Sequence, residues 1–204
     1  MRSTTPEDLA GHCKTCWLNL EICLCDVLPK IPTRTEIVIV RHVAELRLTS
    51  NTARFAALSL PNARILEHGG GTHFDDRELS HPGTMLLYSA SPRPPLEPPR
   101  LDPPPRRLIV LDGSFRQARR MYKKITALRA LPELALPVPE VAPIRLRVPP
   151  HQAGMSTLEA IAHALRLLEG PEASDPLLAL YDELVRRVDR HRGRQRDADG
   201  NAVS

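Results

Sequence analysis

Short runs of apolar residues alternate along this chain with longer amphipathic stretches. The runs are rich in Ile, Val and Leu and have the length of buried strands; they lie at residues 35–42, 63–67, 84–88 and 108–111. The amphipathic stretches repeat apolar residues every three or four positions, as helices with one buried face do; they lie at residues 53–60, 115–128, 156–169 and 176–191. Alternating strands and helices predict an α/β fold with a mostly parallel sheet.

Two segments depart from this alternation. Residues 91–105 (S-P-R-P-P-L-E-P-P-R-L-D-P-P-P) are typical of an extended polyproline-like linker or, alternatively, of a ligand for aromatic-groove modules. The other is the tail after the last helix, which is rich in Arg and has too few apolar residues for a core. A short strand at residues 144–148 is also expected, between the helices at residues 115–128 and 156–169. We therefore expect an N-terminal unit at residues 1–32, one α/β domain at 33–192 with the proline-rich insert, and a disordered basic tail at 193–204.

The strand at residues 108–111 ends abruptly at Asp112 and Gly113. In open α/β sheets the ligand crevice lies beyond the carboxyl ends of the strands, so Asp112 is the candidate catalytic carboxylate. Ser114 follows in the position of a cap for the next helix.

The helix after Asp112 carries five cations opposite its apolar stripe and no acidic residue. A solvated helix face usually mixes both signs, so this one favours contact with an anionic polymer, although an ordinary charged face is the alternative. The cations are Arg116, Arg119, Arg120, Lys123 and Lys124. Arg145 and Arg147 share one face of the strand at residues 144–148, and the formal net charge of +4 agrees with an anionic partner.

All four cysteines lie close together near the N-terminus, at Cys13, Cys16, Cys23 and Cys25. Four clustered thiolates in a reducing compartment are the ligand set of a structural zinc ion. A redox C-x-x-C pair or four unrelated core thiols are the alternatives, and the spacing of radical iron–sulfur enzymes is absent. We expect a zinc knuckle that stabilises the N-terminal segment.

A second polar cluster opens the helix at residues 156–169. Ser156 and Glu159 have the spacing of a capping box and follow the flexible Gly154. A helix N-terminus after a flexible loop also attracts carboxylates, so the cluster can bind a ligand or simply cap the helix. His68 and the three glycines after it resemble a lipase oxyanion loop, but no G-x-S-x-G follows, so a loop with positive φ angles is expected. By itself, His42 is more typical of a satisfied histidine at a strand end.

The motifs resemble those of one known family. L-D-G-S-F-R-Q-A-R-R-M at residues 111–121 is similar to the signature of the DTW-domain proteins, which are tRNA-uridine aminocarboxypropyltransferases, with Ser114 in place of Thr and Phe115 in place of Trp. The cysteine knuckle, the H-x-x-E to S-N-T segment and S-T-L-E-A agree in type and order, so the resemblance spans nearly the whole chain.

This resemblance implies a SPOUT-like fold with a C-terminal knot, which pattern analysis alone would not suggest because knots are rare. It implies transfer of the 3-amino-3-carboxypropyl group from S-adenosylmethionine to N3 of a tRNA uridine, with Asp112 as the base. Phe115 would stack on the target base, and the seven basic residues above would hold the tRNA backbone. The residues expected to hold the cofactor are Tyr88, Ser89, Ser114, Ser156, Thr157 and Glu159.

The same residues are compatible with two alternative functions. The protein could be a SPOUT-type RNA methyltransferase, or a zinc-bearing RNA-binding module without catalytic activity. No apolar run reaches the length of a membrane span, and the N-terminus lacks the apolar core of a signal peptide. We therefore expect a cytoplasmic protein with tRNA as partner, no membrane contact, no obligate protein partner and a monomeric state.

Overall fold

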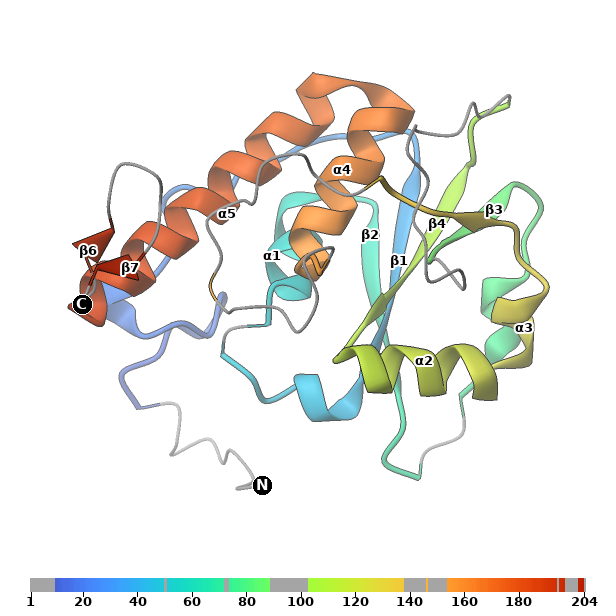
Figure 1. The fold of residues 1–204 in the computed structure, drawn as a ribbon, viewed down its shortest axis with the longest axis horizontal. Coiled ribbons are helices and arrows are strands. Elements are labelled where there is room, and N and C mark those ends of the chain that lie inside the picture. The colour runs from blue at the N-terminus through green and yellow to red at the C-terminus, as the bar shows by residue number, and fades with distance from the viewer. Residues whose placement is uncertain are drawn as a thin grey trace.

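A five-stranded, all-parallel sheet forms the centre of the protein, in the order β2-β1-β4-β3-β5 (Figure 1). The computed structural model describes residues 10–49, 51–71, 74–88, 103–137, 146, 154–193, 195–196 and 202–203. The strands are β1 (Glu36–His42), β2 (Ala63–His68), β3 (Thr84–Leu87), β4 (Arg107–Asp112) and β5 (Glu133–Leu134). The predicted α/β class and the parallel sheet are confirmed, while the short edge strand β5 was not predicted.

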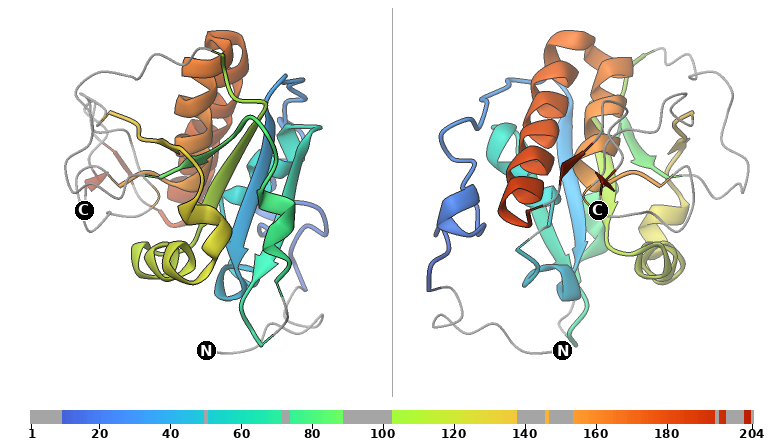
Figure 2. Two further views of the ribbon diagram at one scale, coloured as in Figure 1. Left: turned by 90° about the vertical axis from the view of Figure 1, so that its right-hand side faces the viewer. Right: turned by 60° about the vertical axis from the view of Figure 1, so that its left-hand side comes forward.

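Helices bury both faces of the sheet. The main hydrophobic core joins Ile37 and Ile39 of β1 to the helices α1 (Ala53–Ser59), α4 (Thr157–Glu169) and α5 (Pro171–His191). A second core joins the alternating residues of the same strand, Val38 and Val40, to α2 (Phe115–Lys124), α3 (Thr126–Arg129) and the 3-10 helix η4 (Asp76–Leu79). Burial on both faces explains why β1 reads as a continuous apolar run. Figure 2 shows α4 and α5 packed side by side.

Two helix boundaries differ from the sequence prediction. The helix expected at residues 115–128 is divided at Ile125, which adopts an extended conformation (φ −86°, ψ 105°) and buries its side chain in the second core. The last helix begins at Pro171 instead of residue 176, because a proline is tolerated in the first turn and Gly170 (φ 98°) turns the chain between α4 and α5. Pro176 therefore lies inside α5.

Several predicted features lie wholly or partly outside the described residues. Only Leu146 represents the strand at residues 144–148, and only residues 103–105 represent the proline-rich insert, so both remain predictions. In the tail, β6 (Gln195–Arg196) and β7 (Ala202–Val203) form a two-residue antiparallel ladder, and its expected disorder remains untested. The remaining 3-10 helices are η2 (Leu20–Ile22) and η3 (Val43–Glu45).

No helix in the described part of the chain combines the length and apolarity needed to cross a membrane.

The end of α4 is tied to the start of β1 by one side chain. Glu169 Oε1 accepts the backbone N–H of Thr35 at 2.7 Å, and its Oε2 accepts that of Arg34 at 2.9 Å. Only 9% of this side chain is exposed, so little water competes for the two amides. This contact fixes α4 along the sheet and thereby fixes the position of its N-terminus.

We expect Glu169→Ala to lower the free energy of unfolding by about 2 kcal/mol, because it leaves two backbone donors without an acceptor. Urea denaturation followed by circular dichroism measures this. The matched control is Glu172→Ala, an exposed carboxylate three residues later, which should change stability by no more than about 0.5 kcal/mol. Equal losses in the two variants would show that the Glu169 contact does not stabilise the fold.

Candidate active site and metal centre

The carboxyl ends of β1, β2 and β4 bring polar side chains to one edge of the sheet. In the parallel register Arg41 lies opposite Asp112, and His42 lies opposite His68. Helix α2 begins three residues after β4 ends and runs past this edge (Figure 1). Asp112 therefore occupies the crevice position that the sequence predicted for it.

Asp112 is buried and fully engaged by two hydrogen-bond donors. Its side chain is 3% exposed. The Asn51 side-chain amide donates to Oδ2 at 2.6 Å, and the Thr157 hydroxyl donates to Oδ1 at 2.6 Å. The carboxylate thus joins three elements: β4, the segment before α1 and the first turn of α4.

Burial raises the pKa of Asp112 above the ordinary value of an aspartate. The hydrogen bonds from Thr157 and Asn51 and the positive charge of Arg41 act in the opposite direction, but burial outweighs them. The result is a carboxylate that is more basic than usual. That property suits a group that takes a proton from a weak acid.

Two residues that support this carboxylate, one of them indirectly, were not selected by the sequence analysis. Arg41 is 6% exposed and donates from Nε to Glu67 Oε1 at 3.0 Å and from Nη1 to Asn51 Oδ1 at 3.4 Å. Asn51 Oδ1 also accepts the Arg54 amide at 3.3 Å. Asn51 also orients Asp112, through the hydrogen bond from its side-chain amide. The two residues are 61 positions apart in the sequence, so no local sequence pattern predicts this contact.

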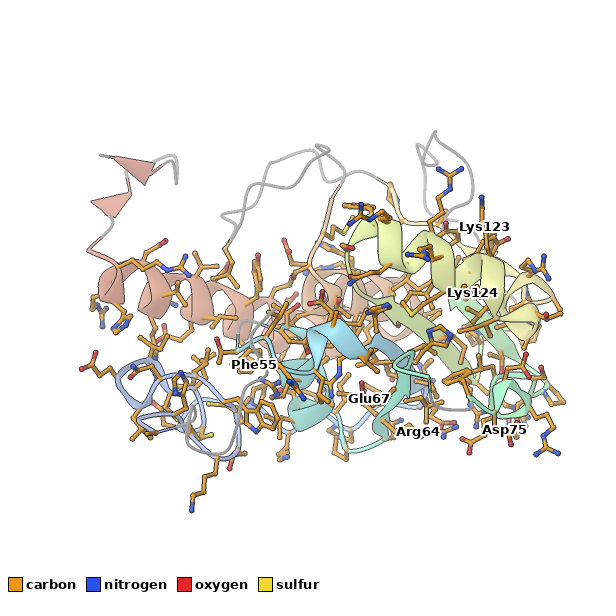
Figure 3. The ribbon with its side chains drawn as sticks, turned by 90° about the horizontal axis from the view of Figure 1, so that it is seen from below. Phe55, Arg64, Glu67, Asp75, Lys123 and Lys124 are labelled. Carbon is orange, nitrogen blue, oxygen red and sulfur yellow. The ribbon has the colours of Figure 1, made fainter. Side chains whose placement is uncertain are left out.

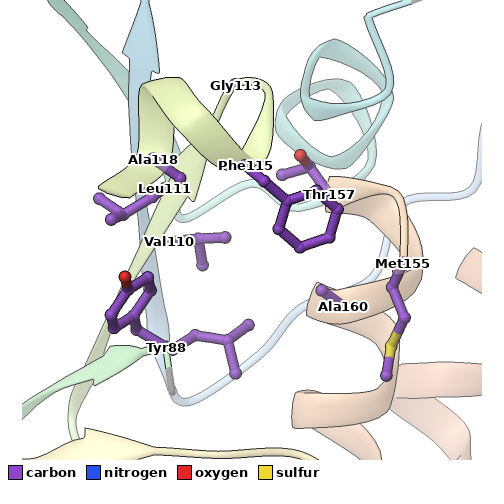
Figure 4. Close-up of a pocket in the computed structure, with 10 residues that line it drawn as sticks. Tyr88, Val110, Leu111, Gly113, Phe115, Ala118, Met155, Thr157 and Ala160 are labelled. Atoms are coloured by element: carbon purple, nitrogen blue, oxygen red, sulfur yellow. The ribbon is translucent and has the colours of Figure 1, made fainter. Parts of the chain in front are cut away.

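An apolar pocket lies beside Asp112, between the end of the sheet and the start of α4 (Figure 4). It encloses about 600 Å³, including the solvent at its mouth. The lining residues are Leu87, Tyr88, Val110, Leu111, Gly113, Phe115, Ala118, Met155, Thr157 and Ala160. The pocket contains three residues that the sequence analysis selected: Tyr88, Phe115 and Thr157. The other lining residues were missed because apolar side chains in strands and helices look like ordinary core.

The aromatic side of this pocket is braced from behind. The rings of Tyr88 and Tyr122 stack with their centroids 4.6 Å apart, and the Tyr122 hydroxyl donates to Glu133 at 2.9 Å. Phe115 is instead 53% exposed at the mouth. A planar ligand can therefore meet one fixed ring and one accessible ring.

The remaining predicted cofactor residues act first as helix caps. Ser114 forms a capping box with Gln117 at the start of α2, and Ser156 forms one with Glu159 at the start of α4. The predicted capping interactions are confirmed. Glu159 uses Oε2 to accept the Ser156 amide at 2.8 Å, while Oε1 is buried and has no hydrogen-bond partner among the described residues. Ser89 lies outside the described residues.

The five cations of α2 are all exposed, and none forms an ion pair with a described residue. The same helix buries Met121. Figure 3 shows Lys123 on the outer side of α2. The charge of Lys124 is instead close enough to the end of β2 to help lower the pKa of His68, although burial of His68 is the larger cause. Arg145 and Arg147 lie outside the described residues, so their place beside this face is untested.

The glycine loop after β2 has the backbone that the sequence predicted. Gly69, Gly70 and Gly71 have φ angles of 109°, 71° and 84°, which disfavour other residues. His42 Nδ1 accepts the Ala44 amide at 3.1 Å and caps η3, in agreement with a satisfied strand-end histidine.

The four cysteines form one compact cluster. Their Sγ atoms all lie within 4.8 Å of one another, with Cys13 and Cys25 at 3.5 Å and Cys16 and Cys23 at 3.7 Å. Thiolates bound to a tetrahedral zinc ion at about 2.3 Å would be about 3.8 Å apart, so this donor set fits a structural zinc site. The predicted metal ligands are thereby brought together by the fold.

We expect Cys23→Ser to lose the bound metal and to lower the melting temperature, because one of four ligands is removed and metal binding stabilises the folded segment. Metal content by mass spectrometry and thermal unfolding measure this. Thr15→Ser, a change inside the same loop that removes no thiolate, is the matched control. A Cys23→Ser protein that keeps its full metal content would exclude Cys23 as a ligand.

Comparisons with known proteins agree with this arrangement. A family model described as the DTW domain matches residues 10–189. A Drosophila melanogaster protein named tRNA-uridine aminocarboxypropyltransferase 2 is 30% identical over 86% of this chain and 74% of its own length. The Arabidopsis thaliana tRNA-uridine aminocarboxypropyltransferase A is 31% identical over 91% and 86%, and a Macaca fascicularis relative is 30% identical over 80% and 58%. No solved structure matches the chain significantly. The chain belongs to the DTW-domain family, and these relatives are enzymes.

Proposed function

We propose that this protein modifies tRNA by transferring the 3-amino-3-carboxypropyl group of S-adenosylmethionine to N3 of a uridine. The observation that carries the proposal is a buried, unusually basic Asp112 beside an aromatic pocket, in a chain related over most of its length to enzymes of that name. The α2 cations next to this pocket favour a nucleic acid as the second substrate. The proposal includes a SPOUT-like fold with a C-terminal knot, for which the parallel α/β sheet is the present support.

The pocket residues fit the donor. Tyr88, Val110 and Met155 offer apolar surface for an adenine ring and a thioether-like chain. The N-terminus of the 13-residue helix α4 lies at the same pocket through Thr157, and its free N–H groups favour a carboxylate. Ser114, Ser156 and Ser89 complete the proposed polar contacts, and the unpaired Glu159 Oε1 is the candidate partner of the donor ammonium.

In the proposed reaction a bond forms between uridine N3 and the γ-carbon of the donor while the carbon–sulfur bond breaks, and the electron pair returns to sulfur to give methylthioadenosine. The proton on N3 must leave as this bond forms. Asp112 is the group in the site with the basicity to take it. Since the Thr157 hydroxyl both lines the pocket and donates to Asp112, we propose that the proton passes through this hydroxyl to Asp112.

The pocket also decides which carbon of the donor reacts. Both the methyl group and the γ-carbon next to the sulfonium are electrophilic, so only their position relative to N3 selects the product. Phe115, exposed at the pocket mouth, can stack on the uracil ring and fix the approach of N3. An RNA methyltransferase would use the same residues, with S-adenosylmethionine bound so that its methyl group, rather than the γ-carbon, faces N3.

Mass spectrometry of nucleosides from tRNA incubated with protein and S-adenosylmethionine tests the proposal directly. We expect a uridine heavier by one aminocarboxypropyl group, together with methylthioadenosine. A gain of one methyl group would assign the protein to methylation instead. No cofactor binding in calorimetry would leave only an RNA-binding module.

Asp112→Asn should lower the transfer rate by at least about 100-fold while the protein stays folded and binds the cofactor, because the amide cannot accept the proton. In the unchanged protein the rate should fall on acidification, starting above the pH at which an ordinary aspartate protonates, since the pKa of Asp112 is raised and the ionised form is required. Asp175→Asn, at an exposed carboxylate of α5, is the matched control and should keep the normal rate and pH profile. Retained activity in Asp112→Asn would remove this residue from the chemistry.

Reversing Arg119 and Lys123 to Glu should weaken tRNA binding and reduce its salt dependence by about one logarithmic unit of slope per lost phosphate contact. Filter binding at several salt concentrations measures both. The control reverses Arg34 and Arg106, which are exposed at the amino ends of β1 and β4, so that net charge changes equally. If both double variants bind tRNA equally, the α2 face is only a solvated surface.

A further inference from the structure

We infer that Arg54 is a positioning residue that couples the metal centre to the active-site carboxylate. Arg54 lies in the first turn of α1, between the cysteine knuckle and Asn51. It is 7% exposed, although a guanidinium is strongly polar. Such a side chain must be held by specific partners, which are the carbonyls of Cys16 and Leu46. The backbone N–H of the same residue contacts Asn51, so Arg54 touches both sites.

On the side of the knuckle, the guanidinium holds the turn that carries two metal ligands. Arg54 Nη1 donates to the carbonyl of Cys16 at 3.4 Å, and the guanidinium carbon lies 4.2 Å from the centre of the Trp17 ring. Trp17 has a φ of 64°, and among the described residues it is the one non-glycine with a positive φ. The strained C-x-x-C-W turn thus presents the backbone carbonyl of Cys16 and the face of the Trp17 indole ring to Arg54.

On the side of the active site, Arg54 acts through Asn51. The Arg54 backbone N–H donates to Asn51 Oδ1 at 3.3 Å, and Asn51 Nδ2 donates to Asp112 at 2.6 Å. Because one end of the amide is held by Arg54 and Arg41, the other end points its N–H₂ group at the carboxylate. A shift at the start of α1 would therefore turn the donor away from Asp112.

The charge of Arg54 points to the metal cluster as its counterpart. Arg54 forms no ion pair with a carboxylate in the described part of the chain. Four thiolates around a divalent cation carry two excess negative charges, which a buried guanidinium next to Cys16 neutralises in part. Loss of the metal would remove those charges and release the turn, so metal occupancy and the orientation of Asn51 depend on each other.

The chain supplies a matched control for this inference. Arg187 of α5 also donates to the carbonyl of a candidate metal ligand, Cys23, but it pairs with Asp26 and Glu183. Among the described residues, no hydrogen bond joins Arg187 to Asn51 or to Arg54. Arg54→Met and Arg187→Met should both release metal to a chelator about 10-fold faster, because each loses a charge-assisted hydrogen bond at the knuckle. Arg54→Met alone should shift the NMR resonances of the Asn51 side-chain amide.

Activity gives a second measurement, which rests on the proposed function. With metal bound, Arg54→Met should lower kcat about 10-fold with little change in KM, while Arg187→Met keeps the normal kcat. If the unchanged protein transfers nothing, the proposed function fails, but metal release and the Asn51 resonances still decide the coupling.

The coupling is overturned if Arg54→Met leaves the release rate and the Asn51 amide resonances unchanged, or if Arg187→Met shifts those resonances equally. If Arg54→Met fails to fold, Arg54→Lys replaces it, because lysine keeps the positive charge but lacks the forked guanidinium. Its metal release rate and its Asn51 amide shift should lie between those expected for the unchanged protein and for Arg54→Met. Chelation of metal from the unchanged protein gives an independent result: the Asn51 resonances must move, and constant resonances would refute the inference.

Discussion

A single buried carboxylate determines how the elements of the candidate active site are arranged. Removing a charge from water is costly unless donors replace the lost hydration. Asn51 and Thr157 provide those donors at 2.6 Å. Asn51 precedes β4 in the sequence, and Thr157 follows it. The segment before α1 and the first turn of α4 must therefore converge on the end of β4. This requirement places the apolar pocket next to Asp112. It also buries the carboxylate, and this burial raises its pKa although the two donors act to lower it.

The start of α4 combines two tasks in adjacent residues. Ser156 and Glu159 satisfy each other's backbone amides, which leaves the Thr157 hydroxyl available for Asp112. Glu169 at the far end of the same helix ties it to β1. The helix is thus fixed at both ends, and a group fixed in this way can orient a ligand without moving during the reaction.

The N-terminal knuckle is too small to fold around its own apolar residues. Leu18 and Leu24 are buried in the main core, so the knuckle shares the hydrophobic core of the domain. Two arginines donate to backbone carbonyls of the knuckle: Arg54 of α1 to that of Cys16, and Arg187 of α5 to that of Cys23. Docking by these contacts places the cysteine cluster against the same helix whose start supports Asp112. The candidate metal centre and the candidate active site therefore share structural elements although their residues are far apart in sequence.

The sequence by itself determined the features that depend on near neighbours. Strand periodicity located β1 to β4, and the spacing of Ser156 and Glu159 identified a helix start. The cysteine spacing predicted the cluster that could hold a metal ion, and the D-G turn put Asp112 at a strand end. Only the tertiary structure decided which groups meet. It separated α2 from α3 at Ile125, added β5, gave Asn51 and Arg41 their roles, and made apolar residues such as Met155 part of a pocket. The reason is that hydrophobic periodicity reports the environment of each residue, whereas a hydrogen bond across 61 residues depends on how the whole chain packs.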